Sequence, residues 1–276
     1  MWRALEERWP RPSVMGVLNV TPDSFSDGGR FVDPGDAVAH GLQLVAEGAA
    51  LVDIGAESTR PGAASVSVDE ELERVEPVLE GLRGVAVSID TSKAEVARRA
   101  LEVGAALVND VTALRGDPAM AEVVASGDAF LCLMHMQGEP RTMQVAPHYD
   151  DVVGDVLAFL EERLAFAVER GIAEERICID PGIGFGKTPD QNLELLRRLD
   201  ELLVLGRPVL VGVSRKSTLG KVVGDPTATT GSVAASVAAA VAAYARGASI
   251  VRAHDVRETV EALAVAVAVE RGRITA

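Results

Sequence analysis

Three stretches of nearly the same form decide the fold: "EGAALVDIG" at Glu47–Gly55, "VGAALVND" at Val103–Asp110 and "RGASIVRAH" at Arg246–His254. In each, a helical pattern ends at a glycine, and a small residue, a short apolar run and a polar residue follow. Glycine commonly ends a helix, and a short apolar run is typical of a strand that is buried on both faces. The phrase therefore predicts repeated strand–helix units that form a parallel sheet.

The same alternation runs along the whole chain. The expected strands are Val14–Asn19, Leu51–Ile54, Ala86–Ile89, Leu107–Asn109, Ala129–Met134, Ile177–Ile179, Val209–Val213 and Ile250–Arg252. The expected helices are Pro34–Glu47, Val68–Leu82, Lys93–Val103, Pro118–Ser126, Tyr149–Glu169, Pro189–Leu199, Thr229–Arg246 and Val256–Arg271. Because no Pro-rich or Ser-rich linker interrupts them, we expect one domain over residues 1–276. This count and length favour an α/β fold of the closed (β/α)8 TIM barrel type, and an open doubly wound sheet is the alternative.

Composition excludes several classes of partner. The 276 residues carry a formal net charge of −14 without a basic patch, which argues against nucleic acid. The N-terminus lacks the apolar core of a signal peptide, and the most apolar stretch, Ser232–Ala243, is shorter than the roughly 18 residues of a membrane span. Cys132 and Cys178 lie inside apolar runs and are expected to be small buried hydrophobes in a reducing compartment. We therefore expect a cytoplasmic protein with no membrane partner.

Polar residues stand where every expected strand ends. They are Asn19, Asp53, Asp90, Asn109–Asp110, His135, Asp180, Ser214–Arg215–Lys216, and Arg252 with His254. That loops are generally polar explains the polarity but not the choice of groups. In a parallel barrel these ends converge on one face, where ligands bind. The order predicts a cleft with an acceptor-rich side from the early strands and a cationic side from the last two. Arg252 and His254, two residues apart, share a face in extended geometry and are suited to hold a phosphate.

The stretch "DPGIGFGKTPD", Asp180–Asp190, looks like a phosphate loop but fails the test for one. Pro181 stands where the first glycine of that motif belongs, and no dinucleotide-binding spacing occurs here. In "GVSRK", Lys216 replaces the second glycine of a nucleophile elbow. We expect the glycines to form a tight turn that lets Asp180 face the cleft. A carboxylate there can accept two parallel N–H bonds from an amino-amidine edge, such as that of guanine or a pterin.

Two long segments follow the first two strands, and both are candidate lids. They are "NVTPDSFSDGGRF" at Asn19–Phe31 and "GAESTRPGA" at Gly55–Ala63, and ordinary surface loops are the alternative. In the second, Thr59 and Arg60 are candidates to contact an anion, and Pro61 stiffens the turn. The histidines and cysteines show no zinc-ligand spacing. A hard cation such as Mg²⁺, held by one Asn oxygen and by substrate phosphate oxygens, is compatible with the sequence.

These blocks together resemble one family, the dihydropteroate synthases, over nearly the whole chain. The motifs that carry the resemblance are "MGVLNVTPDSFSDGG", "DIGAESTRPGA", "SIDTSKAEVA", "GAALVNDVTAL", "LMHMQGEPRTMQ", "DPGIGFGKTPDQN", "VGVSRKSTLG" and "RAHDV". The resemblance implies a pterin-binding barrel and a transferase of folate biosynthesis. Its members join (7,8-dihydropterin-6-yl)methyl diphosphate to 4-aminobenzoate, which yields 7,8-dihydropteroate and diphosphate. It also implies a homodimer.

The resemblance assigns roles to individual residues. Asp90, Asn109, Asp180, Phe185 and Lys216 would line the pterin pocket. Asn19 would be the Mg²⁺ ligand and, with Thr59, Arg252 and His254, would hold the diphosphate. Thr59, Arg60, Pro61 and Ser217 would lie near 4-aminobenzoate, and the catalytic group would be Asp90, Lys216, Arg252 and His254. The departures from the family pattern are Ala56, where many members have Gly, and Thr218–Leu219, and they bear on loop packing.

The residues suggest a dissociative reaction, because no Ser, Cys or Lys is paired with a base that would make it a nucleophile. Charge on the departing diphosphate would be met by preorganised cations. Two rival functions remain. One is a pterin-dependent methyltransferase that passes a methyl group to a corrinoid, and it has no need of the diphosphate clamp. The other is a non-catalytic pterin-binding paralogue, which has no need of both long loops.

Overall fold

The computed structural model describes residues 3–21, 33–58, 65–138 and 142–274. Within them, eight parallel strands pair in sequence order, and β8 returns to pair with β1, so the barrel is closed. The strands are β1 (Ser13–Asn19), β2 (Leu51–Gly55), β3 (Val87–Asp90), β4 (Leu107–Asp110), β5 (Phe130–Met134), β6 (Ile177–Asp180), β7 (Val209–Gly212) and β8 (Ala248–Ala253). The expected (β/α)8 barrel is confirmed, and the open sheet is excluded.

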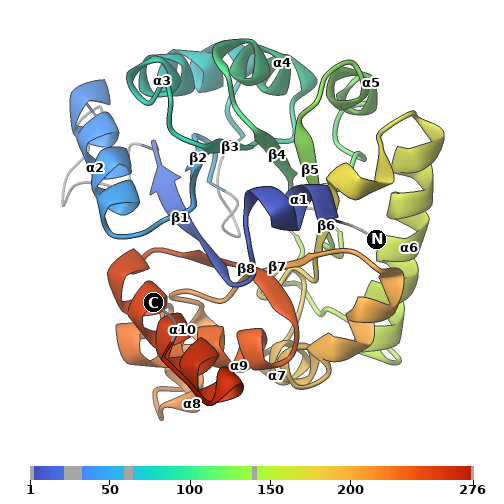
Figure 1. The fold of residues 1–276 in the computed structure, drawn as a ribbon. Helices are drawn as coiled ribbons and strands as arrows, with labels where there is room; N and C mark the ends of the chain where they lie inside the picture. The colour runs from blue at the N-terminus through green and yellow to red at the C-terminus, as the bar shows by residue number, and fades with distance from the viewer. Residues whose placement is uncertain (1–2, 22–32, 59–64, 139–141, 275–276) are drawn as a thin grey trace.

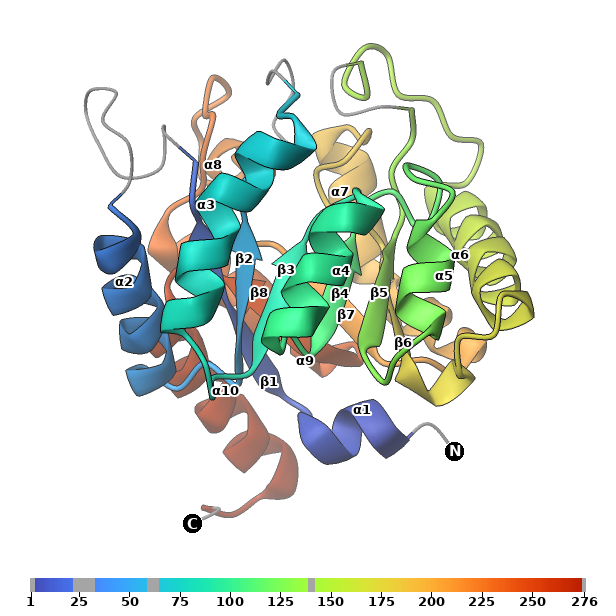
Figure 2. The same ribbon diagram turned by 90° about the horizontal axis from the view of Figure 1, so that it is seen from above.

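Helices surround this barrel (Figures 1 and 2). They are α1 (Arg3–Arg8), α2 (Pro34–Ala46), α3 (Val68–Gly81), α4 (Ala94–Val103), α5 (Met120–Ala125), α6 (Val152–Glu169), α7 (Pro189–Arg197), α8 (Ser217–Val222), α9 (Val233–Ala245) and α10 (Val256–Arg271), with short 3₁₀ turns η1 (Glu174–Arg176) and η2 (Leu199–Leu205). Two of them, α1 and α8, were not predicted.

Capping side chains explain where several helices begin later than predicted. Ser232 accepts the backbone N–H of Ala235 at 3.2 Å, so α9 begins at Val233 rather than at residue 229. Asp151 accepts the N–H of Val153 at 3.3 Å, so α6 begins three residues after Tyr149. Such caps satisfy N–H groups that have no partner inside the helix, and they therefore set the boundary.

Helix α1 closes the N-terminal end of the barrel, and Figure 1 shows it lying across that end. Leu5 is fully buried, and Trp9, just past the helix, is 3% exposed and stacks edge-on against Phe130. They pack on a layer of inward-facing side chains that includes both cysteines. Cys132 and Cys178 are buried and free, as predicted. Because this end is plugged by apolar side chains, ligand chemistry belongs to the other end.

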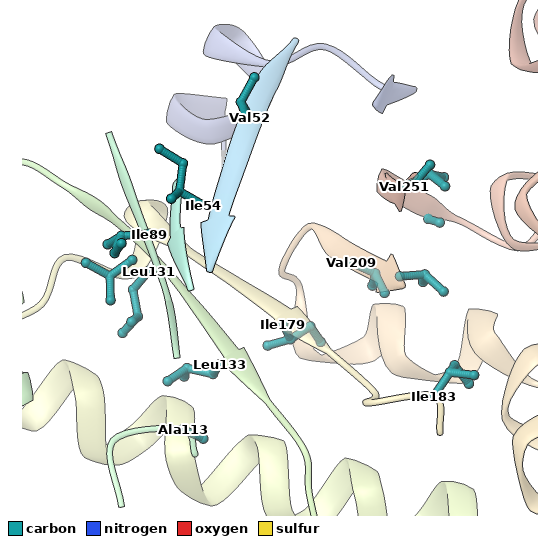
Figure 3. Packing of buried hydrophobic residues seen from close by; sticks show 14 of the residues in the cluster. Val52, Ile54, Ile89, Ala113, Leu131, Leu133, Ile179, Ile183, Val209 and Val251 are labelled. Carbon is teal, nitrogen blue, oxygen red and sulfur yellow. The ribbon is translucent and has the colours of Figure 1, made fainter. Parts of the chain in front are cut away.

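The period-two alternation of each strand divides its side chains between two cores. In β2, Leu51 belongs to the inner cluster with α1, whereas Val52 and Ile54 belong to the larger cluster between strands and helices. Figure 3 shows part of this larger cluster. Asp53 shares the inward face with Leu51, since residues two apart point the same way. A strand that is buried on both faces thereby carries a carboxylate into the barrel interior.

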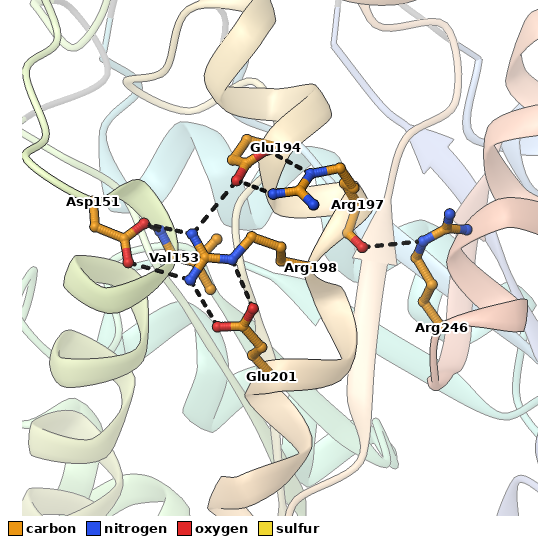
Figure 4. A network of polar contacts seen from close by, with 7 residues as sticks. All are labelled: Asp151, Val153, Glu194, Arg197, Arg198, Glu201 and Arg246. Atoms are coloured by element: carbon orange, nitrogen blue, oxygen red, sulfur yellow. Dashed lines mark hydrogen bonds and ion pairs between the residues drawn. The ribbon is translucent and has the colours of Figure 1, made fainter.

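The outer surface carries a network of ion pairs that joins the start of α6 to α7 and η2 (Figure 4). Arg198 contacts Asp151 at 2.7 Å and Glu201 at 2.6 Å, and Arg197 contacts Glu194 at 2.6 Å. Exposed pairs of this kind add little to stability, because water screens them. Among the helices of the described ranges, none is both long and apolar enough to cross a membrane.

Candidate active site

Side chains from four strands bring opposite charges into direct contact. Arg252 of β8 places Nε 2.6 Å from Asp53 Oδ2 of β2 and Nη2 3.1 Å from Asp90 Oδ2 of β3. Asn109 of β4 donates its side-chain N–H to Asp53 Oδ2 at 3.2 Å. The acceptor-rich and cationic sides predicted from the order of strand ends therefore meet at one place.

Burial and mutual repulsion set the charge of this cluster. Burial and, next, repulsion by the Asp53 carboxylate raise the pKa of Asp90 to about 7, although Arg252 opposes both. Burial works against the charge of Arg252, but Asp53 and Asp90 outweigh it and raise the pKa of the guanidinium. At neutral pH the cluster thus holds a charged Arg252 and an Asp90 that can gain or lose a proton.

Two acceptor atoms in the cluster are poised for a ligand. Asp53 Oδ1 and Asn109 Oδ1 are buried, and neither has a hydrogen-bond partner within the described part of the chain. A buried polar atom without a partner costs about 1–3 kcal/mol, so a ligand that supplies donors here gains by pairing them. Sequence reasoning named Asp53 as a strand end but did not place it in the site. The available signal was an acid inside a strand with both faces buried, where a charge needs a partner.

The glycine-rich stretch after β6 forms the predicted tight turn around Asp180. Gly182 has a φ of +66°, and its N–H donates to Asp180 Oδ1 at 2.7 Å. A Cβ at Gly182 would lie only 1.9 Å from the backbone oxygen of His135, so no other residue fits. Burial raises the pKa of Asp180 to about 6, although the Gly182 N–H and Lys216 oppose the shift. Asp180 is therefore ionised at neutral pH.

Lys187, the lysine of the phosphate-loop-like "GK" pair, turns into the protein instead of toward a ligand. It is 2% exposed, and its Nζ donates to the carbonyl oxygens of Gly182 and Phe185, both at 2.9 Å. The same Nζ lies 2.8 Å from His135 Nδ1. Burial lowers the pKa of Lys187 to about 7. The lysine holds the glycine-rich turn from behind, which explains the partial match to a phosphate loop.

The Phe185 ring forms an apolar wall beside Asp180, and the Lys216 ammonium group lies against that ring. Lys216 Nζ lies 4.4 Å from the centroid of the Phe185 ring, at a distance suited to a cation–π contact. Phe185 packs on a cluster of Val111 and the buried methionines 134, 136 and 143. The neighbouring Arg215 turns away and pairs with Asp255 at 2.5 Å. A flat apolar wall next to carboxylate and amide acceptors suits a flat heterocycle with N–H groups on its edge.

His254 lies beside Arg252 but does not contribute a positive charge. Its Nδ1 lies 3.1 Å from Ser214 Oγ, which also accepts the backbone N–H of His254 at 3.1 Å. Burial, and next the charge of Arg252, lower the pKa of His254 to about 3. Sequence reasoning counted this residue on the cationic side, whereas its burial favours the neutral form. A neutral imidazole can contribute a hydrogen bond to an anion, and the positive charge comes from Arg252.

The remaining predicted residues lie at the rim or outside the described residues. Asn19 ends β1 and pairs with Gly55, and Ser217 opens α8 directly after Lys216. Thr59, Arg60 and Pro61 lie outside the described residues, as does most of the first long segment. The departures from the family pattern are accommodated: Ala56 is fully buried, and Thr218 accepts a hydrogen bond from Asn192 at 3.0 Å.

A metal ion would depend on few protein ligands. Among the described residues, no three His, Cys, Asp or Glu side chains form a group that could hold an ion. Asn19 offers one hard amide oxygen at the mouth of the barrel. Mg²⁺ keeps several waters and often binds through one or two protein oxygens plus substrate phosphates, so this donor set fits it.

The sequence from residue 15 to residue 254 matches the family of the pterin binding enzymes. Dihydropteroate synthase of Escherichia coli K12 is 49% identical over 259 residues, which are 92% of this chain and 90% of the relative. That of Neisseria meningitidis serogroup B is 48% identical over 274 residues and 96% of each chain.

Solved structures of dihydropteroate synthases are similar to this chain in both sequence and fold. Yersinia pestis dihydropteroate synthase in complex with a sulfonamide drug superposes with a TM-score of 0.88 at 47% identity over 95% of each chain. The Xanthomonas albilineans enzyme with 4-aminobenzoic acid gives 0.86 at 51% identity over 95% of this chain and 94% of that one. The Burkholderia cenocepacia enzyme with 7,8-dihydropteroate gives 0.84 at 49% identity over 95% and 93%. This chain belongs to the pterin-binding enzyme family and, within it, to the dihydropteroate synthases.

Proposed function

We propose that this protein condenses (7,8-dihydropterin-6-yl)methyl diphosphate with 4-aminobenzoate, which yields 7,8-dihydropteroate and diphosphate in folate biosynthesis. The observation that carries the proposal is one mouth in which Asp53, Asp90 and Arg252 are in contact beside Asn109. Relatives of similar sequence and fold have been solved with 4-aminobenzoic acid and with 7,8-dihydropteroate. The protein is accordingly a transferase.

The pterin ring lies, in this proposal, against Phe185 and the methionine cluster. Its amino-amidine edge donates to Asp180, which is ionised at neutral pH and still has lone pairs beyond the bond from Gly182. Asp53 Oδ1 and Asn109 Oδ1, which lack partners among the described residues, accept further ring N–H groups. Every buried acceptor of the cluster would then be paired, so binding relieves a cost that the unliganded site carries.

The diphosphate is held at the mouth by Arg252, His254 and Asn19, and the family resemblance adds Thr59, which is outside the described residues. Arg252 uses Nε and Nη2 for the two carboxylates, and Nη1 makes no hydrogen bond to a described residue. This arrangement suits a guanidinium that grips a phosphate oxygen while Asp53 and Asp90 fix its plane. Bound Mg²⁺, with Asn19 as its ligand, supplies charge neutralisation on the diphosphate oxygens. His254 donates a hydrogen bond as a neutral imidazole.

Bond cleavage precedes attack by the aryl amine, and no protein nucleophile takes part. Cys132 and Cys178 lie in the apolar layer at the plugged end of the barrel, and Lys187 is enclosed by two carbonyl oxygens and the His135 ring. Ionised carboxylates in a dry cleft favour the cationic methylene that forms as diphosphate leaves. Ser217 lies near 4-aminobenzoate in this proposal, and the family resemblance assigns Arg60 and Pro61, which are outside the described residues, to the same substrate. A covalent enzyme–pterin adduct trapped and detected by mass spectrometry would refute this mechanism.

A single assay tests the function. The protein is mixed with the dihydropterin diphosphate, 4-aminobenzoate and Mg²⁺, and diphosphate release is measured. Release that requires 4-aminobenzoate is expected. Asp180→Asn should lower kcat/KM by about 100-fold through loss of a charged hydrogen-bond acceptor, whereas Asp190→Asn, an exposed acid of α7, should change nothing. Pterin binding without release indicates the non-catalytic paralogue, and methyl transfer to a corrinoid indicates the methyltransferase.

Two further properties, the location of the protein and its oligomeric state, complete the proposal. We infer a cytoplasmic location, which the buried free thiols of Cys132 and Cys178 support, since a reducing compartment keeps them unpaired. We also infer a homodimer, as the family resemblance implies. Sedimentation equilibrium at several protein concentrations tests the dimer, and a monomeric mass throughout would exclude it.

A further inference from the structure

The side chain of Asn192, near the start of α7, joins the glycine-rich turn after β6 to the first turn of α8. Its Oδ1 accepts the backbone N–H of Gly184 at 2.7 Å, and its Nδ2 donates to Thr218 Oγ1 at 3.0 Å. Asn192 is 2% exposed and Thr218 is 4% exposed. Because a buried polar atom is costly to leave without a partner, the two bonds hold the amide in one orientation. We call this connection the Asn192 bridge.

The turn that the bridge holds is also the surface on which Lys216 lies. A Cβ at Gly184 would lie 3.1 Å from Lys216 Cδ and 3.4 Å from its Nζ, so the lysine chain passes directly over the bare backbone of this glycine. The ammonium group ends 4.4 Å from the centroid of the Phe185 ring. Burial raises the pKa of Asp180, and the charge of Lys216 opposes that shift. The place of Gly184 therefore bears on how Lys216 meets both the ring and the carboxylate.

The two ends of the bridge stand next to the two partners of this contact. Gly184 directly precedes Phe185, and Thr218 follows Lys216 by two residues in the first turn of α8. Asn192 therefore links the two backbone segments that carry the aromatic ring and the ammonium group. The hydroxyl that accepts its N–H comes from Thr218, one of the departures from the family pattern, so this half of the bridge is a feature of the present chain.

We propose that Asn192, held by Thr218, is a positioning residue that sets Lys216 against Phe185 and thereby sets the affinity of the site for the pterin ring. This rests on the proposed function, in which the ring lies against Phe185. Asn192 acts through Gly184 and Lys216 and contacts no substrate. The alternative is a hydrogen bond that only packs α7 on α8, which would affect stability without favouring the ring over the diphosphate.

Three variants and one control separate these roles. Thr218→Val keeps the branched shape and removes the hydroxyl acceptor, whereas Thr218→Ser keeps the hydroxyl. Asn192→Leu combined with Thr218→Val replaces both bonded side chains by apolar ones, an exchange that is often close to neutral for stability. The matched control is Ser249→Ala at the plugged end, because Ser249 is 2% exposed and donates to Glu6 at 2.7 Å. It also loses one buried hydroxyl and its hydrogen bond, but away from the pocket.

The measurements are the thermal midpoint and two dissociation constants from calorimetry, one for the dihydropterin diphosphate and one for inorganic diphosphate with Mg²⁺. For Thr218→Val and for the double variant, we expect the Kd of the dihydropterin diphosphate to rise by at least about fivefold, because a small displacement of the ring contacts is costly. The Kd of inorganic diphosphate should stay at the wild-type value. Thr218→Ser should restore the pterin Kd, and Ser249→Ala should leave both constants unchanged.

A second cycle tests whether the effect passes through Lys216. In a Lys216→Met background, Thr218→Val should change the pterin Kd by less than about twofold, because the side chain that the bridge positions is already absent. Independent effects would instead add, and the full loss would appear in both backgrounds.

Three results would overturn the positioning role. A wild-type pterin Kd in Thr218→Val and in the double variant makes the bridge structural only. Equal losses for the dihydropterin diphosphate and for inorganic diphosphate indicate a general loosening of the site. A full loss in the Lys216→Met background shows that the bridge does not act through Lys216. Failure of the proposed function is recognised separately, because the wild-type protein would then release no diphosphate with both substrates present.

Discussion

Substitution of one glycine tests whether the geometry of the turn after β6 sets the pterin pocket. In Gly182→Ala, the new Cβ would lie 1.9 Å from the carbonyl oxygen of His135, a backbone atom that cannot rotate away. The two segments must separate by roughly 1.1 Å, the difference between 1.9 and the 3.0 Å below which such contacts are essentially absent. The movement would displace Asp180, whose carboxylate accepts the Gly182 N–H.

The magnitude follows from a comparison of two glycines with the same backbone conformation. Gly138 has a φ of +71° against +66° for Gly182, but among the described residues the nearest atom to a Cβ at Gly138 is 3.8 Å away. Gly138→Ala should therefore lower the unfolding free energy only by the cost of a left-handed backbone conformation for alanine, about 1–2 kcal/mol. Gly182→Ala adds the overlap with a buried backbone, so we expect a loss of at least about 4 kcal/mol.

Urea denaturation gives the two free energies, and calorimetry gives the Kd of the dihydropterin diphosphate. A displacement near 1 Å at a site of this kind lowers kcat/KM by about 100-fold, which is our expectation for Gly182→Ala alone. Equal losses of stability in the two variants, or a Gly182→Ala protein with wild-type pterin affinity, would show that the turn does not set the pocket.

Three further predictions follow from buried groups. Lys187→Met leaves the carbonyl oxygens of Gly182 and Phe185 without their donor and the His135 ring without its partner, and should lower the unfolding free energy in urea by about 3 kcal/mol. Unchanged stability would mean that the glycine-rich turn does not depend on Lys187. Burial raises the pKa of Asp180 from 3.8 to about 6, so between those values the folded protein binds more protons than the unfolded chain. This group therefore makes the unfolding free energy fall as pH rises through that interval, by at most about 1.4 kcal/mol per pH unit, and Asp180→Asn should remove that part of the slope in a pH series of urea titrations. Trp9→Ala should cost about 3–5 kcal/mol, because a buried aromatic is lost from the plugged end, while kcat measured below the melting temperature stays unchanged.

Much of the fold can be predicted from local patterns. A buried parallel strand, a helix ended by glycine and a polar strand end each depend on a few neighbouring residues, so the eight strands and the barrel could be predicted without coordinates. The tight turn around Asp180 could be predicted as well, because closely spaced glycines admit conformations that other residues resist. Helices α1 and α8 were not among the predicted elements.

Tertiary contacts decided which residues of the site pair with one another and which of them carry a charge. Arg252 finds Asp53 at a separation of 199 residues along the chain, and no local pattern indicates which acid it meets. The same holds for Lys187, which looks like a phosphate ligand in sequence but is enclosed by two carbonyl oxygens and the His135 ring, and for His254, which burial keeps neutral. Sequence alone determined which chemical groups stand at the mouth of this barrel. Their partners, charges and directions were decided only by the folded structure, because burial and long-range contact set the electrostatic free energy of each group.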